Sequence, residues 1–258
     1  MSVATTRPRI LRSELVKLLT LRSVTITLVV TAALPIGMAS RSAPAVGRAI
    51  TSNSTNLPPG ITPETVGLSW IGLGLIGVIV VGVIAGSSEY TNHQVNTSLL
   101  SVPKRLQLVL TKSWALLLVT VGIGVTTIPA LSIVSQIGLG ELGVLDRGIP
   151  ASLIWRWIGA IGLWVATAQI GFALALLLRQ SLIPLFLMIV ISQLSLALVY
   201  FFPATRYLPF AAGLQIYDPA SITGPALSPV VAVSTLTGWT VVLLGLAIFR
   251  FRRSGSMA

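Results

Sequence analysis

The chain has 258 residues, of which 54% are hydrophobic and 9% are charged, and its mean hydropathy is +0.92. A soluble globular protein of this length needs more polar surface, so the composition excludes that class and indicates an integral membrane protein. The net charge of +11 does not predict a nucleic-acid partner, because the basic residues lie in short segments between apolar runs. The absence of cysteine excludes disulfides and thiolate metal sites.

Residues 1–23 predict an amphipathic helix that lies in the inner membrane interface. Four leucines share one helical stripe: Leu11, Leu15, Leu18 and Leu19. Basic residues such as Lys17 lie mostly opposite, and Glu14 sits at the border. We expect the leucines to enter the acyl chains and the basic residues to approach anionic headgroups. The functional residues expected here are Glu14, Lys17 and Arg22; the alternative is a simple topogenic flank.

Six apolar runs follow, each able to cross a hydrocarbon core of about 30 Å as a helix. They are residues 24–40, 66–86, 113–137, 153–178, 182–202 and 228–249. Their residues do not alternate as in a barrel strand, so helices must satisfy the backbone. The predicted fold class is all-α: a polytopic membrane protein with one transmembrane domain over 1–258, six transmembrane helices and an N-terminal amphipathic interfacial helix.

The first apolar run also has the features of a signal peptide, with a basic leader before it and small residues near Ala39 and Ser40. Because the leader is long and itself patterned, we expect the run to remain as an uncleaved anchor.

The distribution of basic residues predicts the orientation. With the amino terminus inside, five of the 17 basic residues face outward and the other 12 face the cytoplasm. The outer five are Arg41, Arg48, Arg147, Arg156 and Arg206. This asymmetry predicts a multi-pass protein of the cell membrane with both termini in the cytoplasm.

The outer and inner connections differ in character. Residues 41–65, rich in Ser, Thr, Asn and Pro, predict an exposed irregular outer loop. Residues 203–227 alternate apolar and aromatic residues with prolines, which predicts short helices in the outer leaflet before the last span. Residues 179–181 leave room only for a tight inner turn.

The inner segment 87–112 is the most structured-looking stretch that faces the cytoplasm. Val95, Leu99, Val102 and Leu106 recur at helical spacing. A short helix between two spans could receive a push from a soluble partner and pass it to the membrane helices. The alternative is an ordinary solvated connector.

The residues of this segment resemble those of the membrane subunits of ABC-2-type transporters, particularly from high-GC Gram-positive bacteria. The resemblance rests on Glu89, Tyr90, Val95, Thr97, Ser98, Leu99, Leu100, Val102, Pro103, Lys104, Arg105 and Lys112. The leader residues 13–23, the motif at 207–209 and the closing run 239–253 also fit the family.

The resemblance implies a six-helix permease that dimerises, with itself or with a related permease subunit, and binds two ABC ATPase subunits. The segment 87–112 would supply the coupling helix. The residues that the resemblance assigns to ATPase binding are Glu89, Tyr90, Gln94, Val95, Thr97, Leu99, Leu100, Pro103 and Arg105. The implied activity is ATP-driven export.

The energy source can also be argued from the residues. All six acids lie outside the spans or at their edges, which argues against coupling to an ion gradient through a buried carboxylate. The phosphate-binding motif of P-loop ATPases does not occur in the sequence, so ATP hydrolysis requires a separate chain. The glycines of 72–77 match a dinucleotide fingerprint, but inside a span they favour close helix packing, together with Gly82 and Gly86.

No cofactor, metal ligand set or catalytic group is expected, since His93 is the only histidine. Gln136, Gln169 and Gln193 predict hydrogen bonds between helices, with a substrate path as the alternative. Trp155, Arg156 and Trp157 predict an anchor at the outer interface, with the guanidinium on phosphate. A non-transporting membrane subunit that binds an ATPase, and an intramembrane enzyme, remain alternative functions.

Overall fold

The computed structural model describes residues 7–52, 57, 61–91, 105–145, 148–222 and 224–253. Every regular element in these ranges is a helix, which confirms the all-α prediction. The α-helices are α1 (Arg7–Thr20), α2 (Arg22–Thr51), α3 (Ile71–Thr91), α5 (Arg105–Leu139), α6 (Ala151–Leu178), α7 (Leu182–Phe201), α8 (Pro209–Tyr217) and α9 (Pro229–Arg253). Short 3-10 helices are η2 (Leu68–Trp70), η3 (Gly140–Leu142), η5 (Pro203–Tyr207) and η6 (Pro219–Ser221).

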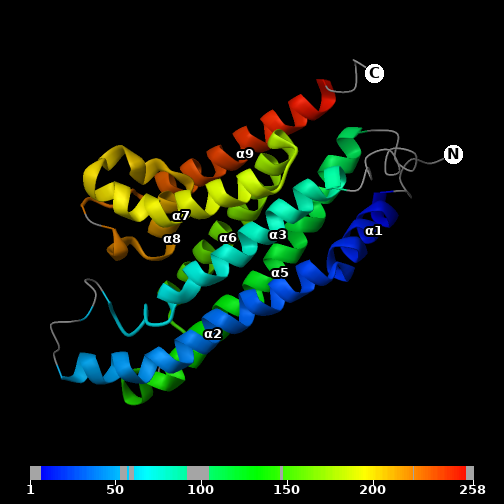
Figure 1. Ribbon diagram of the computed structural model, residues 1–258. Coiled ribbons are helices and arrows are strands. Elements are labelled where there is room, and N and C mark those ends of the chain that lie inside the picture. Colours follow the sequence, from blue (N-terminus) through cyan, green and yellow to red (C-terminus); the bar gives the residue numbers. More distant parts are fainter. Residues whose placement is uncertain are drawn as a thin grey trace.

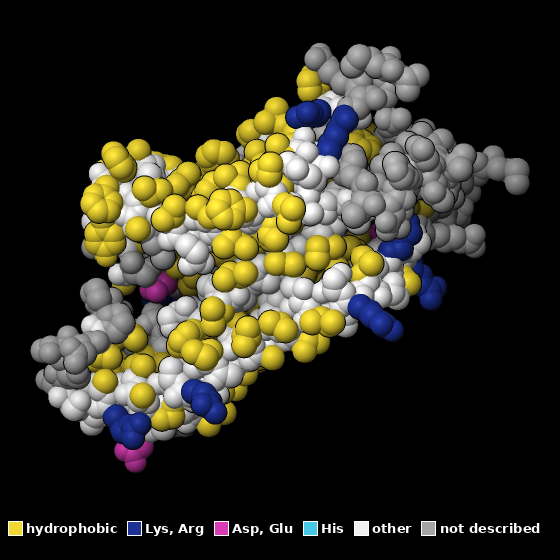
Figure 2. Space-filling model, viewed as in Figure 1, with side chains coloured by type: hydrophobic (Ala, Val, Ile, Leu, Met, Phe, Trp, Pro, Cys, Tyr) yellow, Lys and Arg dark blue, Asp and Glu magenta, His cyan; other side chains and the backbone are white. Residues whose placement is uncertain are grey.

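Five of the described helices are long and apolar enough to cross a membrane: α2, α3, α5, α6 and α9. In the residues that the structure describes, the chain is therefore all-helical, with the long apolar helices of a polytopic membrane protein. Figure 2 agrees with this, because hydrophobic side chains cover the middle of the visible face while Lys and Arg side chains lie toward its ends.

The core is built around α6, which packs against α3, α5, α8 and α9. Trp164 and Phe172 of α6 are completely buried. The closest approach is to α3, where a Cβ atom on Gly82 would lie 2.9 Å from the Cα of Ala168. A Cβ on Gly86 would likewise lie 2.8 Å from the Cβ of Ala175. Small residues thus let the two backbones meet, as predicted for the glycines of this helix.

The prediction of an irregular loop over 41–65 is wrong for its first part, because α2 continues to Thr51. Ala43 and Gly47 are buried against the end of α5, where Gly138 and Leu139 lie. The Nε1 of Trp70 also donates a hydrogen bond to Ser42 Oγ at 2.8 Å. These tertiary contacts outweigh the weak helical preference of a Ser- and Pro-containing sequence.

Two other connections have the predicted local structure. The α6–α7 turn is tight because Arg179 adopts a left-handed conformation with φ of 57°, and its N–H bonds to the Ala175 carbonyl at 2.9 Å. Within the second connection, residues 203–221 contain the short helices η5, α8 and η6, and α8 packs against α6 and α9. The inner segment is narrower than predicted, since 87–91 continue α3 and 105–112 begin α5.

Figure 1 shows that α1, the end of α3, the start of α5 and the end of α9 lie at one end of the bundle. We call this the terminal end. The opposite, distal end carries the end of α2, the α5–α6 connection and α8. At 30 and 35 residues, α2 and α5 are about 45 and 52 Å long, which exceeds a hydrocarbon core of about 30 Å.

Candidate functional site

The buried face of α1 carries a carboxylate at its centre. Leu18 and Glu14 are each 2% exposed where α1 packs on α5 and α2, and Leu11 and Leu15 are partly buried beside them. Leu19, predicted to share this face, is 50% exposed. The predicted helix is thus present, but its buried face differs from the prediction. It includes Glu14, which was expected at the border, and it leaves out Leu19.

Glu14 is paired with two lysines. Its Oε1 accepts a hydrogen bond from Lys17 Nζ at 2.6 Å, and Lys17 is largely exposed. Its Oε2 lies 3.9 Å from Lys112 Nζ of α5, and that lysine side chain is 7% exposed. Within the described part of the chain the Oε2 atom accepts no hydrogen bond, so its interaction with Lys112 is an ion pair without a hydrogen bond.

Lys112 extends the connection to a third helix. Its Nζ donates a hydrogen bond to Ser88 Oγ of α3 at 3.0 Å. Ser88 lies in the last turn of α3 and Lys112 near the start of α5, so the two residues stand on either side of segment 92–104. The polar cluster of Glu14, Lys17, Ser88 and Lys112, here called the terminal cluster, joins α1 to both helices that hold this segment.

The next residue of α5 adds a tie to α6. Ser113 Oγ donates to Gln169 Oε1 at 2.8 Å, and Gln169 Nε2 donates to the Ser113 carbonyl at 2.9 Å. This confirms the predicted hydrogen bond between helices for Gln169. The tie follows the terminal cluster directly along α5, so α1, α3, α5 and α6 are joined by polar contacts near one end.

Several predicted site residues lie in the helix ends next to the terminal cluster. Glu89 and Tyr90 lie in the last turn of α3, and Arg105 is the first residue of α5, but the structure does not describe their side chains. Arg22 begins α2 and is exposed. The remaining predicted residues lie outside the described part of the chain: Gln94, Val95, Thr97, Leu99, Leu100 and Pro103.

Sequence reasoning gave no role to Ser88 and named Lys112 only as part of the family resemblance. A signal for the ion pair was present, because Glu14 borders the leucine stripe of α1 and Lys112 opens a long apolar run. A single acid and a single base in apolar surroundings are expected to pair, since a buried charge is costly without a partner.

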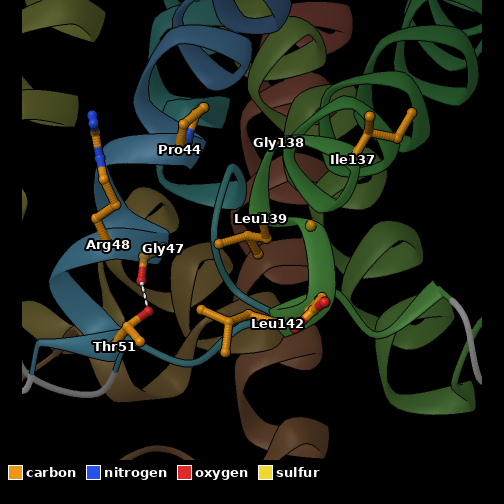
Figure 3. A pocket seen from close by; sticks show the side chains of 10 residues that line it. Pro44, Gly47, Arg48, Thr51, Ile137, Gly138, Leu139 and Leu142 are labelled. Carbon is orange, nitrogen blue, oxygen red and sulfur yellow. Dashed lines mark hydrogen bonds between the residues drawn. The ribbon is translucent and has the colours of Figure 1, made fainter.

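The distal end has a shallow groove of about 510 Å³ between α2 and the end of α5. Its lining residues are Pro44, Gly47, Arg48, Thr51, Ile137, Gly138, Leu139, Gly140, Glu141 and Leu142. Figure 3 shows Leu139 and Leu142 between the two helices, and the Thr51 hydroxyl bonded to the Gly47 carbonyl at 2.8 Å. Its apolar lining holds two exposed charged residues, Arg48 and Glu141.

The distal end also holds α8 through an arginine. Arg156 Nη1 of α6 donates to the Tyr217 carbonyl at 2.6 Å, at the negative end of the α8 dipole. The Arg156 guanidinium, predicted to bind a lipid phosphate, thus donates a hydrogen bond to a protein carbonyl. Burial raises the pKa of Asp218 above its ordinary value of 3.8, and the Arg156 charge partly opposes that shift. Burial also raises the pKa of Tyr217, with the neighbouring Asp218 charge adding to the shift.

Among the residues that the structure describes, no group of three His, Cys, Asp or Glu side chains could hold a metal ion. Glu89 and His93 stand four residues apart in the sequence, but His93 lies outside the described residues and the Glu89 side chain is not described. No protein-family model matches the chain, and no curated protein matches it.

Proposed function

We propose that this chain is the membrane-spanning permease subunit of an ATP-driven ABC-2-type exporter, and that a separate ABC ATPase drives it. The observation that carries the proposal is the terminal cluster, which joins the N-terminal helix to both sides of segment 92–104. Such a connection would let a partner that docks on α1 and on this segment move α3 and α5 together.

The proposal includes six spans, with α7 as the sixth. This helix has 20 residues, or about 30 Å, which matches the hydrocarbon core. Figure 1 supports six crossings, because α1 and the end of α9 both lie at the terminal end of the bundle. An odd number of crossings would leave them at opposite ends. The terminal end is the cytoplasmic one in this proposal, in agreement with the excess of basic residues expected there.

The energetic cost of the terminal cluster supports a working role rather than simple stability. Glu14 and Lys112 are both taken out of water, and an apolar pair of similar size is often as stable or more stable. We infer that the cluster is kept because it fixes α1 to α5 in one arrangement. When ATP closes the partner ATPases, α1 and segment 92–104 move as one unit and shift α3 and α5 against α6.

The test is reconstitution of the full chain in vesicles with the ABC ATPase that the proposal requires, which is sought first among the neighbouring genes. We expect no ATP hydrolysis by the chain alone, hydrolysis by the complex, and ATP-dependent movement of at least one probe from a panel of fluorescent phospholipids and cationic dyes. Robust ATP hydrolysis by the purified chain alone would contradict the proposal. A complex that hydrolyses ATP but moves no probe would favour the non-transporting subunit.

Matched variants sharpen this experiment. Lys112→Met removes the buried charge on α5, and Lys17→Met removes the exposed lysine that contacts the same carboxylate. We expect Lys112→Met to lower ATP-dependent transport at least tenfold relative to ATP hydrolysis, and Lys17→Met to leave the ratio of transport to hydrolysis nearly unchanged. Equal ratios in the two variants would remove the coupling role from the cluster.

A further inference from the structure

The groove at the distal end combines an apolar lining with two charges of opposite sign. Arg48 of α2 lines it on one side and Glu141 of η3 lines it on the other. Figure 3 shows the Arg48 side chain extending from α2, apart from Leu142. Both charged residues are exposed, and in the described part of the chain neither side chain has an ion-pair or hydrogen-bond partner. Within these residues both charges are open to a ligand.

Glycines shape this groove. Gly138 lets α2 and α5 meet beneath it, because a Cβ atom on Gly138 would lie 2.9 Å from the Cβ of Ala43. Gly140 has a φ of 60°, which other residues rarely adopt, and a Cβ there would meet nothing within 4 Å. This turn carries the chain from α5 into η3 and brings Glu141 to the wall of the groove. The acid is thus held opposite α2 by the backbone.

Two helix ends add to the electrostatics. The last residue of α2, Thr51, and the last residue of α5, Leu139, both line the groove. The carbonyl groups at the end of a helix carry partial negative charge, which favours a cation, and Glu141 adds to this effect. The Arg48 guanidinium has the forked donors that suit a phosphate. The groove therefore matches a molecule that carries a phosphate, an ammonium group and an apolar part.

The depth of the groove indicates where that molecule resides. Lys112 is charged and opens the apolar run of α5, so it marks one edge of the hydrocarbon core. Leu139 lies about 40 Å further along α5, and a tilt of ~20° reduces this to about 38 Å across the membrane. The core is about 30 Å thick, with about 5–8 Å of headgroups on each side. Leu139 thus lies in the headgroup layer at the other edge.

An apolar contact is present at the rim of the groove. Ile137 lines the groove and is 70% exposed, one turn closer to the hydrocarbon core than Glu141. At this depth an exposed isoleucine meets the upper acyl chains of the adjacent leaflet. A molecule with acyl chains beside Ile137 and with both a phosphate and an ammonium group at the level of the groove is a zwitterionic phospholipid.

We propose that the distal groove binds the headgroup of phosphatidylethanolamine from the adjacent leaflet, with the phosphodiester on Arg48 and the primary ammonium at Glu141. A primary ammonium donates three hydrogen bonds, whereas the trimethylammonium of phosphatidylcholine donates none, so Glu141 distinguishes the two lipids. This inference does not rest on the exporter function, because it requires only that α2 and α5 cross the membrane.

The selectivity is tested by native mass spectrometry of the full chain in detergent, titrated with phosphatidylethanolamine or with phosphatidylcholine of the same acyl chains. We expect phosphatidylethanolamine to bind about three- to tenfold more tightly, as for an exposed ion pair with hydrogen bonds. Glu141→Gln should remove this preference, and Glu141→Asp should keep part of it. Equal binding of the two lipids by the wild type, or an unchanged preference in Glu141→Gln, overturns the proposal.

The arginine has a matched control on the same helix. Arg41 is also exposed on α2 but does not line the groove. We expect Arg48→Gln to weaken phosphatidylethanolamine binding about three- to tenfold and Arg41→Gln to leave it nearly unchanged. Equal effects would show that the lipid responds to net charge alone, and would also overturn the proposal. Because both arginines are exposed, the two variants should unfold at the same temperature as the wild type, which checks their folding.

Free O-phosphoethanolamine separates a lipid from a soluble ligand, since it carries the same charged groups without acyl chains. We expect it not to displace the lipid at equal concentration, because it lacks the apolar contact at Ile137. Complete displacement would assign the groove to a soluble zwitterion and overturn the lipid proposal. Loss of ATP-driven transport in vesicles, with the lipid preference intact, would instead contradict only the exporter function.

Discussion

Lys112 Nζ lies 3.9 Å from Glu14 Oε2, and both side chains are almost fully buried although they come from the N-terminal helix and from α5. Buried ions are costly unless they are paired, so each residue explains the presence of the other. The pair makes α1 part of the packed bundle, whereas its sequence alone predicts a helix that floats in the membrane interface.

The first prediction concerns the free energy of this ion pair. Glu14→Leu leaves the Lys112 ammonium without its buried carboxylate, and we expect unfolding in detergent to become easier by roughly 3–5 kcal/mol. The double variant with Lys112→Met should regain most of that loss, because no buried charge remains. Lys17→Ala serves as the control and should cost under about 1 kcal/mol, since exposed ion pairs contribute little. If the double variant instead loses the sum of what Glu14→Leu and Lys112→Met lose separately, Glu14 and Lys112 are not coupled.

The second prediction concerns the seam between α3 and α6. A methyl group at Gly82 would meet the backbone of Ala168, which cannot move aside, whereas one at Gly72 would meet nothing within 4 Å. We expect Gly82→Ala to destabilise the protein by about 1–3 kcal/mol through overpacking. Gly72→Ala should be neutral or stabilising by up to about 1 kcal/mol, because alanine favours the helix. Thermal unfolding of the two variants in one detergent gives the comparison, and equal effects would contradict the packing described here.

The third prediction concerns pH. Burial raises the pKa of Asp218, so between its ordinary value of 3.8 and the raised value the folded chain binds more protons than the unfolded chain. The contribution of Asp218 to the free energy of unfolding therefore falls as pH rises through that window, and is constant outside it. Asp218→Asn should lack this dependence. We expect the unfolding temperature of the variant to gain on that of the wild type as pH rises from about 4 to about 7. A difference that stays constant with pH would show that the Asp218 carboxyl titrates normally.

The fourth prediction concerns orientation. Lys17 belongs to the terminal end and Arg48 to the distal groove, and both are exposed. In cells that express the cysteine-free chain with one substitution, a membrane-impermeant maleimide should label Arg48→Cys at once. It should label Lys17→Cys only after permeabilisation. The reverse pattern would place segment 92–104 outside the cell, where no ATPase could reach it.

The helical architecture was predictable because long apolar runs leave the backbone no other solution in a membrane. The boundaries were less predictable. Residues 41–51 carry turn-forming side chains, yet Ala43 and Gly47 find a buried place against α5 that the local sequence does not reveal.

The candidate site was predictable only in part. The leucine stripe indicated which residues of α1 are apolar. The face of α1 that packs on α5, however, is the one that carries Glu14, because Lys112 of α5 supplies the opposite charge. Such a pairing joins residues far apart in the sequence and has no periodic signature. The proposed docking residues from Gln94 to Pro103 lie outside the described residues and stay predictions.

One consequence follows from the continuity of α5. The helix runs without interruption from Lys112, at the ion pair, to Leu139, in the wall of the distal groove. That distance is about 40 Å, so a tilt of ~10° about the ion pair would carry the far tip sideways by ~7 Å. A small rotation imposed on one side of the bilayer is thereby amplified into a displacement as wide as a side chain on the other, with no need for any intermediate moving part.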